Sequence, residues 1–320
     1  MDLIYTNAAG EDVGVILKYT LDLAYGSGEN DFQLETGIGE IEANAFIYIE
    51  GTEFGGIIDG LKVDTEKQIV NYIGRSFHGI LNSCIIQPPS GAAYMTVSGE
   101  ANEVLTTIIE ALGVGELFEV AANDSGITIP SSHIDRYIKG YDGINKVLKA
   151  NGAKLGMAFL DGKIHLEAKP VVNYAEDEQY SSDHYKFTIQ KYMNKVNHLI
   201  CLGSGELAER QVVHLYVQED GSISTESQFF VGTDEYAETF DYSSAESIEE
   251  LEKYGRERLQ ELHNNDKAEM KLTDDETVLD INDIVGATEE ITRTTITNRV
   301  VKKIIKIKDN AISIEYKVGD

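Results

Sequence analysis

The sequence predicts an α+β protein that is mainly β, in which two strand-rich parts flank a smaller part made of helices and a hairpin. Short runs rich in β-branched and aromatic residues, separated by Gly, Asn and Asp, fill residues 3–81. The apolar period changes to three and four residues after Gly99. Strand-like alternation returns after the polar stretch 175–183, which predicts a linker or exposed loop.

The length of 320 residues, 42% of them hydrophobic, predicts two or three domains at roughly 100 to 200 residues each. We place a first β-barrel domain at residues 1–86, an α+β insertion at 87–183 and a second β-barrel domain at 184–320. The first domain is dense in glycine and alternates apolar residues, as strands do. Its pattern is typical of a scaffold and not of a catalyst.

The insertion is expected to contain two helices and a hairpin. An apolar stripe from Ala101 to Leu112 predicts an amphipathic helix that stops at Gly113. A second helix is predicted from Asp142, as N-cap, to Gly152, as C-terminal cap. The dipeptide Asp161-Gly162 then predicts a two-residue hairpin turn.

The last domain is predicted to consist of strands with turns at Asp220-Gly221 and Asp309-Asn310, and of one helix at about 244–263. A capping box formed by Ser243 and Glu246 would open this helix. Gly255 interrupts the apolar stripe, which indicates a close approach of helix to sheet or simply a cost in stability. The stripe itself consists of Ile248, Leu251, Leu259 and Leu262.

The charge balance argues against a surface that grips nucleic acid. With 27 basic and 55 acidic residues the formal net charge is −28, so phosphate groups would be repelled. A charge of this size most often reflects a well-solvated surface. The alternative is that part of it lines a channel through which DNA slides without sticking.

The two cysteines do not form a disulfide framework. Cys84 and Cys201 each lie in an apolar, strand-like run, which predicts core residues of a protein assembled in a reducing cytoplasm. The N-terminus has no basic region followed by an apolar core, and about 18 apolar residues nowhere run together, so we expect a soluble chain without secretion signal or membrane contact. The sequon at Asn123 is therefore attributed to chance.

The sequence contains no arrangement of residues that specifically indicates catalysis. His198 precedes Cys201 closely, as a cysteine peptidase could require, but both cysteines are flanked by Ile and Leu, whereas a nucleophilic thiol needs an electropositive, partly exposed site. The sequence lacks G-x-S-x-G, a phosphate-binding loop, HExxH and paired Cys/His spacing. Pairs of carboxylates are too frequent in so acidic a chain to indicate a glycosidase.

One nucleotide-binding motif is present in isolation. Residues 203–208 match the dinucleotide fingerprint G-x-G-x-x-A, but the following E-R-Q-V-V-H-L-Y-V predicts a strand where the fingerprint needs a helix. A tight turn is the expected structure. We therefore predict no catalytic, cofactor-binding or metal-binding residue and no enzymatic activity.

An ordered series of segments resembles the tail-hub (baseplate hub, tail-tip) proteins of siphophages and prophages of Gram-positive bacteria. It covers nearly the whole chain and includes Asn30-Asp31-Phe32, G-T-E-F-G-G-I-I-D-G, G-R-S-F-H-G-I-L, Pro88-Pro89, S-G-E-A-N-E-V-L, N-H-L-I-C-L-G-S-G-E-L-A-E-R, F-D-Y-S-S-A-E-S-I-E-E-L and I-S-I-E-Y-K-V-G-D. The resemblance implies two barrels related to the tail-tube fold, with an α+β insertion. We find no internal sequence repeat that would support the equivalence of the two barrels.

The resemblance also implies a virion structural protein at the distal tip or baseplate of a tail, assembled in the host cytoplasm. In this family three copies form a ring whose six barrels imitate a hexamer, so that the ring joins a six-fold tube to three-fold components. The implied partners are copies of the chain, distal-tail or tail-tube proteins, the tape measure protein and distal tip or receptor-binding proteins, with DNA passing through the lumen unbound. The insertion and the lysine-bearing final hairpin are the candidate partner contacts.

Two other classes of function stay open at this point. One is a tail-associated enzyme that degrades the cell envelope, and the other is a receptor-binding or glycan-binding tail module. The complete absence of tryptophan weakens glycan binding, whereas the 17 tyrosines leave it possible. Unlike many proteins of this kind, the sequence stops just after its last hairpin, so receptor-binding or lytic activities are expected on other chains.

Overall fold

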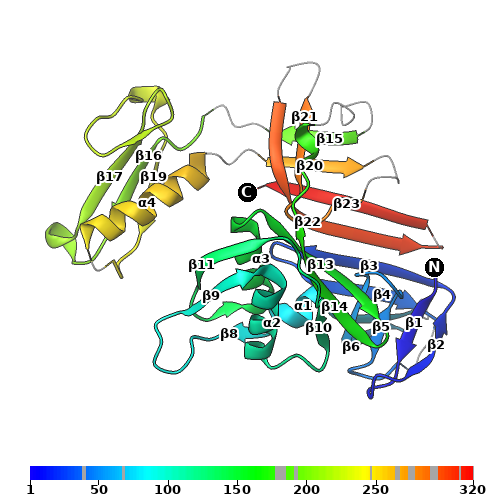
Figure 1. The fold of residues 1–320 in the computed structure, drawn as a ribbon. Helices are drawn as coiled ribbons and strands as arrows, with labels where there is room; N and C mark the ends of the chain where they lie inside the picture. Colours follow the sequence, from blue (N-terminus) through cyan, green and yellow to red (C-terminus); the bar gives the residue numbers. More distant parts are fainter. Residues whose placement is uncertain are drawn as a thin grey trace. The chain divides into compact units, whose positions relative to one another are not determined.

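The structure is a computed structural model (Figure 1). The residues that it describes are 1–37, 41–66, 69–176, 185–190, 194–245, 247–263, 267–272, 278–288, 295–309 and 311–319.

Contacts group the chain into two compact units. The first unit consists of Met1–Thr188 and Glu269–Val318, and the second of Ile189–Ala268 with Gly319–Asp320. The C-terminal strands thus share a unit with the N-terminal strands, as Figure 1 shows for the red and orange strands beside the blue ones. The division at 1–86, 87–183 and 184–320 stays a prediction.

A mainly β architecture with few helices is confirmed. In the described residues the first unit contains a twelve-stranded sheet in the order β15-β20-β23-β22-β3-β4-β7-β6-β5-β1-β2, and β21 pairs with β22. This order is an open path, so closed barrels stay a prediction. The strands are β1 Leu3–Thr6, β2 Asp12–Ile16, β3 Tyr19–Gly26, β4 Asp31–Thr36, β5 Phe46–Tyr48, β6 Gly55–Asp64, β7 Ile69–Ser76, β15 Tyr185–Gln190, β20 Lys267–Leu272, β21 Ile284–Thr288, β22 Thr295–Lys308 and β23 Ala311–Gly319.

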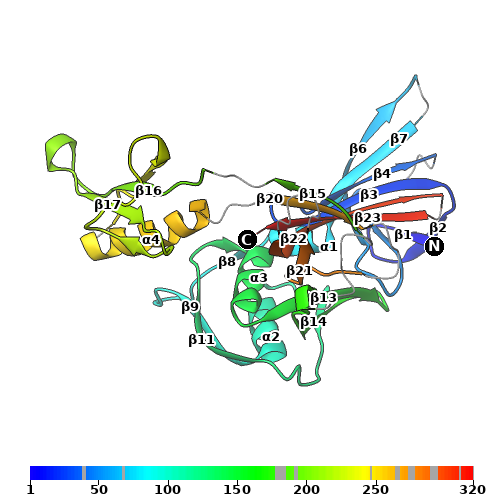
Figure 2. The same cartoon turned by 90° about the horizontal axis from the view of Figure 1, so that it is seen from above.

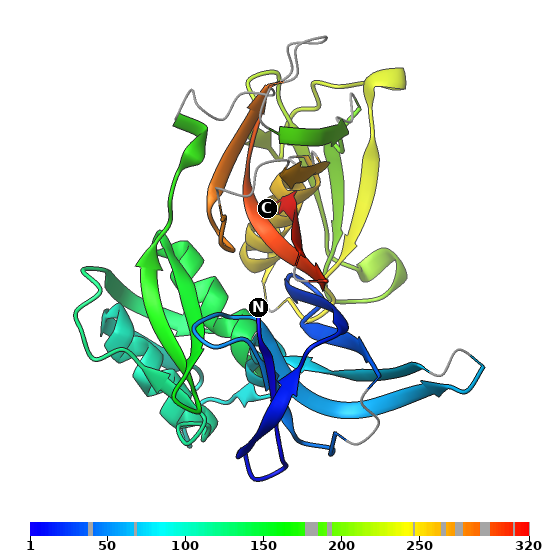
Figure 3. The same cartoon turned by 90° about the vertical axis from the view of Figure 1, so that its right-hand side faces the viewer.

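Alternation along the central strands buries one face of this sheet. In β4 every second residue is buried, and Leu34 faces Leu21 of β3 across the ladder. The solvent face carries polar residues such as Asp22 and Gln33, which are directly opposite each other. This is the expected pattern of an antiparallel sheet with one wet face. The β6–β7 hairpin extends beyond the neighbouring strands (Figures 2 and 3).

The insertion follows β7 and packs three helices with small sheets. Its core is continuous with the first strands, since Tyr48 of β5 belongs to the same buried cluster as the helix residues Leu105 and Leu148. The elements are α1 Phe77–Asn82, β8 Ile85–Ile86, β9 Met95–Glu100, α2 Ala101–Leu112, β10 Phe118–Val120, β11 Thr128–Ile134, β12 Ile138–Lys139, α3 Gly140–Ala150, β13 Ala153–Leu160, β14 Lys163–Pro170 and the 3₁₀ turn η1 Tyr174–Glu176.

The helix ends of the insertion test the sequence predictions. Helix α2 ends at the left-handed Gly113 as predicted, and the Glu100 side chain caps its start by accepting the N–H of Glu103. The prediction of Asp142 as the N-cap of α3 is wrong, because Lys139 holds that position and Asp142 lies in the first turn. The helix begins earlier because residues 138–139 pair with β8 and deliver an extended chain to Gly140, where a Cβ would lie 2.5 Å from the Leu81 carbonyl oxygen.

The turn at Asp161-Gly162 is confirmed. Leu160 pairs with Lys163, and both turn residues have positive φ, of 50° and 78°. Positive φ at both central positions defines the type I′ turn that suits two-residue hairpins. At the final hairpin Asp309 also has positive φ, whereas Asn310 lies outside the described residues.

The second unit is a four-stranded sheet covered on one face by a helix. Its order is β18-β17-β16-β19, with β16 and β19 parallel. The core contains Leu199, Leu215, Leu251 and Leu259. The elements are β16 His198–Leu202, η3 Leu207–Glu209, β17 Val212–Val217, β18 Ile223–Ser224, η4 Gly232–Asp234, β19 Ala237–Asp241 and α4 Ile248–His263.

Helix α4 begins later than predicted. The hydroxyl oxygen of Ser247, and not that of Ser243, accepts the N–H of Glu250, so the Ser243 cap is wrong. The other half of that box, Glu246, lies outside the described residues. Ile248 is exposed instead of joining the buried stripe, because it is the first helical residue. No helix in the described residues is long and apolar enough to cross a membrane.

The predicted close approach at Gly255 is confirmed. A Cβ on this residue would lie 2.4 Å from Cys201 Sγ and 2.8 Å from Leu215 Cδ1. Both distances are below normal van der Waals contact, so the glycine lets α4 rest directly on β16 and β17.

Gly255→Ala is expected to destabilise the second unit by about 1–3 kcal/mol, the usual cost of overpacking a core, despite the higher helix propensity of alanine. Urea unfolding measures the change. Glu257→Ala, on the exposed side of the same helix, is the control and should stay within about 0.5 kcal/mol of wild type. Equal stability of Gly255→Ala and wild type would contradict the close packing.

Candidate functional site

The large sheet contains the same five-strand arrangement twice. We call β3, β4, β5, β6 and β7 module A, and β15, β20, β21, β22 and β23 module B. We number the five strands of a module by their order along the chain. In both modules the first, second, fifth and fourth strands lie side by side in that order, and the third strand pairs with the fourth. Both modules thus arrange their five strands, counted along the chain, in the same way across the sheet. The structure therefore contains an internal repeat that the sequence does not show.

The third strand occupies the same place in both modules. In module A, β5 pairs with the N-terminal end of β6, with Phe46 opposite Ile57. In module B, β21 pairs with the N-terminal part of β22, with Ile284 opposite Arg299. In both modules the third strand therefore leaves the C-terminal part of the fourth strand uncovered, so that another strand can pair there.

The two modules join through β22 and β3. Seven consecutive pairs, from Lys302 opposite Gly26 to Lys308 opposite Thr20, form an antiparallel ladder. Gly26 has φ of 118°, and a Cβ there would lie 2.3 Å from the Val301 carbonyl oxygen. Glycine is therefore required at the end of this ladder.

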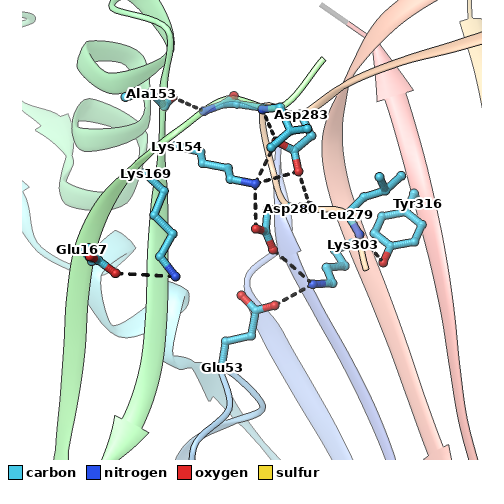
Figure 4. Close-up of polar contacts among 12 residues, drawn as sticks. Glu53, Ala153, Lys154, Glu167, Lys169, Leu279, Asp280, Asp283, Lys303 and Tyr316 are labelled. Carbon is cyan, nitrogen blue, oxygen red and sulfur yellow. Dashed lines mark hydrogen bonds and ion pairs between the residues drawn. The ribbon is translucent and has the colours of Figure 1, made fainter. Parts of the chain in front are cut away.

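A buried charge network lies at this junction (Figure 4). Lys154 of β13 contacts both carboxylate oxygens of Asp283 at 2.8 Å and Asp280 Oδ2 at 2.8 Å. Lys154 and Asp283 are both buried. The insertion is thus tied to the segment that leads into β21.

The second half of the network lies on β22. Lys303 is fully buried and directly opposite Tyr25 of β3. Its Nζ donates to Glu53 Oε1 at 2.6 Å and lies 3.8 Å from Asp280 Oδ1. Asp280 therefore contacts both lysines. The same segment is fixed by the N–H of Leu279, which donates to the hydroxyl of Tyr316 on β23.

Asp280 and Lys303 keep their charges because the opposite charges around them outweigh burial. Burial alone would raise the pKa of Asp280, but the hydrogen bond from Lys154 and the charge of Lys303 hold it below its usual value. Burial would lower the pKa of Lys303, yet Glu53 keeps it raised. Two buried lysines thus share their contacts among three acidic residues, of which Asp283 is buried and Asp280 and Glu53 are partly exposed.

An uncharged histidine borders the network. The ring of His78 stacks on Tyr25 with centroids 4.1 Å apart, and its Nε2 lies 4.0 Å from Glu53 Oε2. Burial lowers the pKa of His78 to about 4, with Glu53 acting against this shift and Lys303 adding to it. His78 is therefore neutral at pH 7. Its Nδ1 and the Tyr25 hydroxyl are buried without a hydrogen-bond partner in the described structure.

His198 and Cys201 do not form the pair that a cysteine peptidase would need. Cys201 is in the core of the second unit, and burial raises the pKa of its thiol to about 11, with the nearby Glu252 adding to the shift. It is a protonated thiol at pH 7 and a poor nucleophile. Cys84 is only partly buried, so the prediction of a core residue fails there. His198 contacts other partners than Cys201.

Those partners form a polar chain that the sequence analysis missed. His198 lies 2.6 Å from Glu235 through Nδ1 and 2.9 Å from His214 Nδ1 through Nε2. The pairing of Ile200 with His214 and of His198 with Tyr216 brings the two histidines to one face of the sheet. The alternating residues of β16 and β17 could be recognised in the sequence. The register in which the two strands pair, which brings the histidines together, could not. In the described residues no group of three or more His, Cys, Asp or Glu side chains is arranged to hold a metal ion.

The G-x-G-x-x-A match is a turn. Gly205 has φ of 97°, and the N–H of Gln211 donates to the Ser204 carbonyl oxygen. The three-residue η3 begins within the motif at Leu207, and β17 follows at Val212. The helix that would direct its N-terminus at a pyrophosphate is replaced by this short turn, so nucleotide binding has no structural support.

Lys154→Met is expected to destabilise the first unit by about 3–5 kcal/mol, since it leaves the buried carboxylate of Asp283 without its counter-charge. Scanning calorimetry measures the shift of the unfolding transition. The control is Lys146→Met, which removes an exposed ion pair with Asp135 of similar length, 2.7 Å, and should cost at most about 1 kcal/mol. Equal shifts of the unfolding temperature for both variants would show that the buried pair stabilises the fold no more than the exposed pair does.

His78 predicts a defined loss of stability in acid. Because its folded pKa of about 4 lies below the unfolded value near 6.5, the unfolded chain binds more protons between these pH values, and stability falls as the pH falls through this window. The full effect is about 3 kcal/mol. His78→Phe should remove this part of the pH dependence, as measured by urea unfolding at pH 7 and pH 4. The exposed His133→Phe should retain it, and unchanged slopes for His78→Phe would refute the assignment.

Comparisons with known proteins show what the fold resembles. No protein-family model and no curated protein matches the sequence. Three solved structures match over almost the whole chain: a 43 kDa tail protein of prophage MuSo2 from Shewanella oneidensis, a tail protein from Neisseria meningitidis MC58 and the prophage tail protein gp18 from Listeria monocytogenes EGD-e.

The three matches agree closely in extent. The Shewanella protein has a TM-score of 0.59 and 13% identity, over 99% of this chain and 98% of that one. The Neisseria protein has a TM-score of 0.53 and 11% identity, over 100% of this chain and 96% of that one. The Listeria protein has a TM-score of 0.51 and 12% identity, over 99% of this chain and 94% of that one. The Gram-positive origin stays a prediction. The chain has the fold of prophage tail proteins.

Proposed function

We propose that this chain is the structural hub at the distal tip or baseplate of a phage tail or phage-like particle. Three copies would form a ring that adapts the six-fold tail tube to three-fold distal components and leaves a channel for DNA or the tape measure protein. The ring would contact distal-tail or tail-tube proteins above and tip or receptor-binding proteins below. Assembly would take place in the host cytoplasm.

The observation that carries this proposal is the repeat of modules A and B within one chain. A ring of three such chains presents six modules of one architecture, which is what a six-fold neighbour requires. The structural similarity to the three prophage tail proteins supports the fold, and their shared description as tail proteins supports a role in a tail. Tail-tube-like barrels are the form that we propose for the modules in the assembled ring.

A structural role without catalysis agrees with the features of the site. The buried charges of the network are matched by direct ion pairs, which is the arrangement that holds chain segments together. The thiol of Cys201 is buried and protonated at pH 7. The net charge of −28 suits a channel that DNA traverses without binding.

The purified chain is expected to form a trimer. Light scattering coupled to size exclusion should give three times the 35.4 kDa of the chain, and negative-stain class averages should show a ring with a central opening. A chain that stays monomeric at the highest attainable concentration would contradict the proposal. Zymography on host cell walls, expected to be negative, separates the hub from a cell-envelope-degrading enzyme.

A further inference from the structure

The fourth strand of module A has an unpaired half where its counterpart in module B is paired. From Gly60 to Val63, β6 pairs with β7 on one side, and the described residues provide no strand on the other. The corresponding C-terminal half of β22 pairs with β3, the first strand of module A. One of two equivalent edges is therefore filled within the chain, and the other is open.

The side chains at the open edge match those of the filled edge. In β22, Ile305 and Ile307 are fully buried against β3, and Ile307 is the residue before the last of the strand. In β6, Leu61 and Val63 hold the same places relative to the strand end. They are directly opposite Tyr72 and Val70, so they point to the core side of the sheet, yet they are 56% and 52% exposed.

The first strand of module B is the matching open edge. In module A the first strand, β3, receives the fourth strand of module B. In module B the first strand, β15, ends the sheet order and has β20 as its neighbour in the described residues. Among the residues that the structure describes, each chain therefore has one free fourth-strand edge and one free first-strand edge, which is the requirement for a head-to-tail contact.

We propose that the C-terminal half of β6 in one copy pairs with β15 of a second copy, in the way that β22 pairs with β3 within the chain. This inference rests on the proposed hub function and names the contact that builds the ring. The pairing would bury Leu61 and Val63 as Ile305 and Ile307 are buried. Intramolecular and intermolecular junctions would then alternate, and six modules would close with three chains if each junction turns the sheet by one sixth of a circle.

The accessibility of the open edge and its likeness to the filled one favour a second copy over another partner. An exposed apolar strand edge is a liability that proteins avoid unless a strand is to be added there. The edge that fits is already present once in the chain, since β22 and β3 show that strands of these two kinds are complementary. The β6–β7 hairpin extends outward from the sheet in Figure 2, so its edge is accessible to another molecule.

The first test removes the apolar side chains of the open edge. The double variant Leu61→Glu/Val63→Glu should lose the trimer, so that light scattering gives the mass of a single chain. Its matched control is Val13→Glu/Val15→Glu on β2, where the exposed fractions of 56% and 42% are similar, and this variant should remain trimeric. Circular dichroism and the unfolding temperature establish that both variants are folded.

The second test does not depend on destabilising any contact. In a Cys84→Ser background, chains with Lys62→Cys are mixed with chains that carry Lys186→Cys, Thr188→Cys or Gln190→Cys, and are oxidised. At least one mixture should give a covalent dimer on a non-reducing gel. Val13→Cys in place of Lys62→Cys should give none.

The outcomes separate this contact from the proposed function. A wild-type trimer that survives Leu61→Glu/Val63→Glu, or that gives no cross-link between β6 and any of the three β15 positions, overturns the contact and leaves the hub proposal standing. A wild-type chain that never associates overturns both. Loss of the trimer together with a β6–β15 cross-link establishes the contact.

Discussion

The antiparallel ladder between β22 and β3 is the interaction on which the rest of the first unit depends. It joins strands that are separated by about 275 residues of sequence and makes one sheet of two modules. The buried charge network lies at the same place, because Lys303 of β22 is directly opposite Tyr25 of β3 and contacts Glu53. Lys154 extends this network to the insertion. One joint therefore positions module A, module B and the insertion together.

The choice of charged groups at this joint has a physical consequence. A buried ion pair often stabilises a fold no more than apolar packing would, but an arrangement that leaves one member unpaired is strongly disfavoured. Asp280 contacts both lysines. A shift of either β13 or β22 would therefore leave at least one buried charge without its partner. We infer that the network selects one placement of the modules. A ring built from repeated junctions needs that precision, because small errors at each junction add up around a circle.

The sequence predicted local structure well and long-range structure poorly, for identifiable reasons. The turn at Asp161-Gly162 and the left-handed end of α2 depend on a few adjacent residues. The N-cap of α3 was misplaced because the pairing of residues 138–139 with a distant strand decides where the helix begins. The repeat of the modules was invisible, because it is conserved in strand order and not in side chains. The network unites residues up to 250 positions apart, which no spacing rule detects.

A three-dimensional electron-microscopy map of the purified assembly tests the central claim most directly. The account predicts a three-fold ring in which twelve-stranded sheets from three chains are continuous, with density of β6 running beside β15 of the adjacent copy. A map in which the sheets end at β6 and β15 without meeting, or in which the number of modules around the ring differs from six, would contradict it.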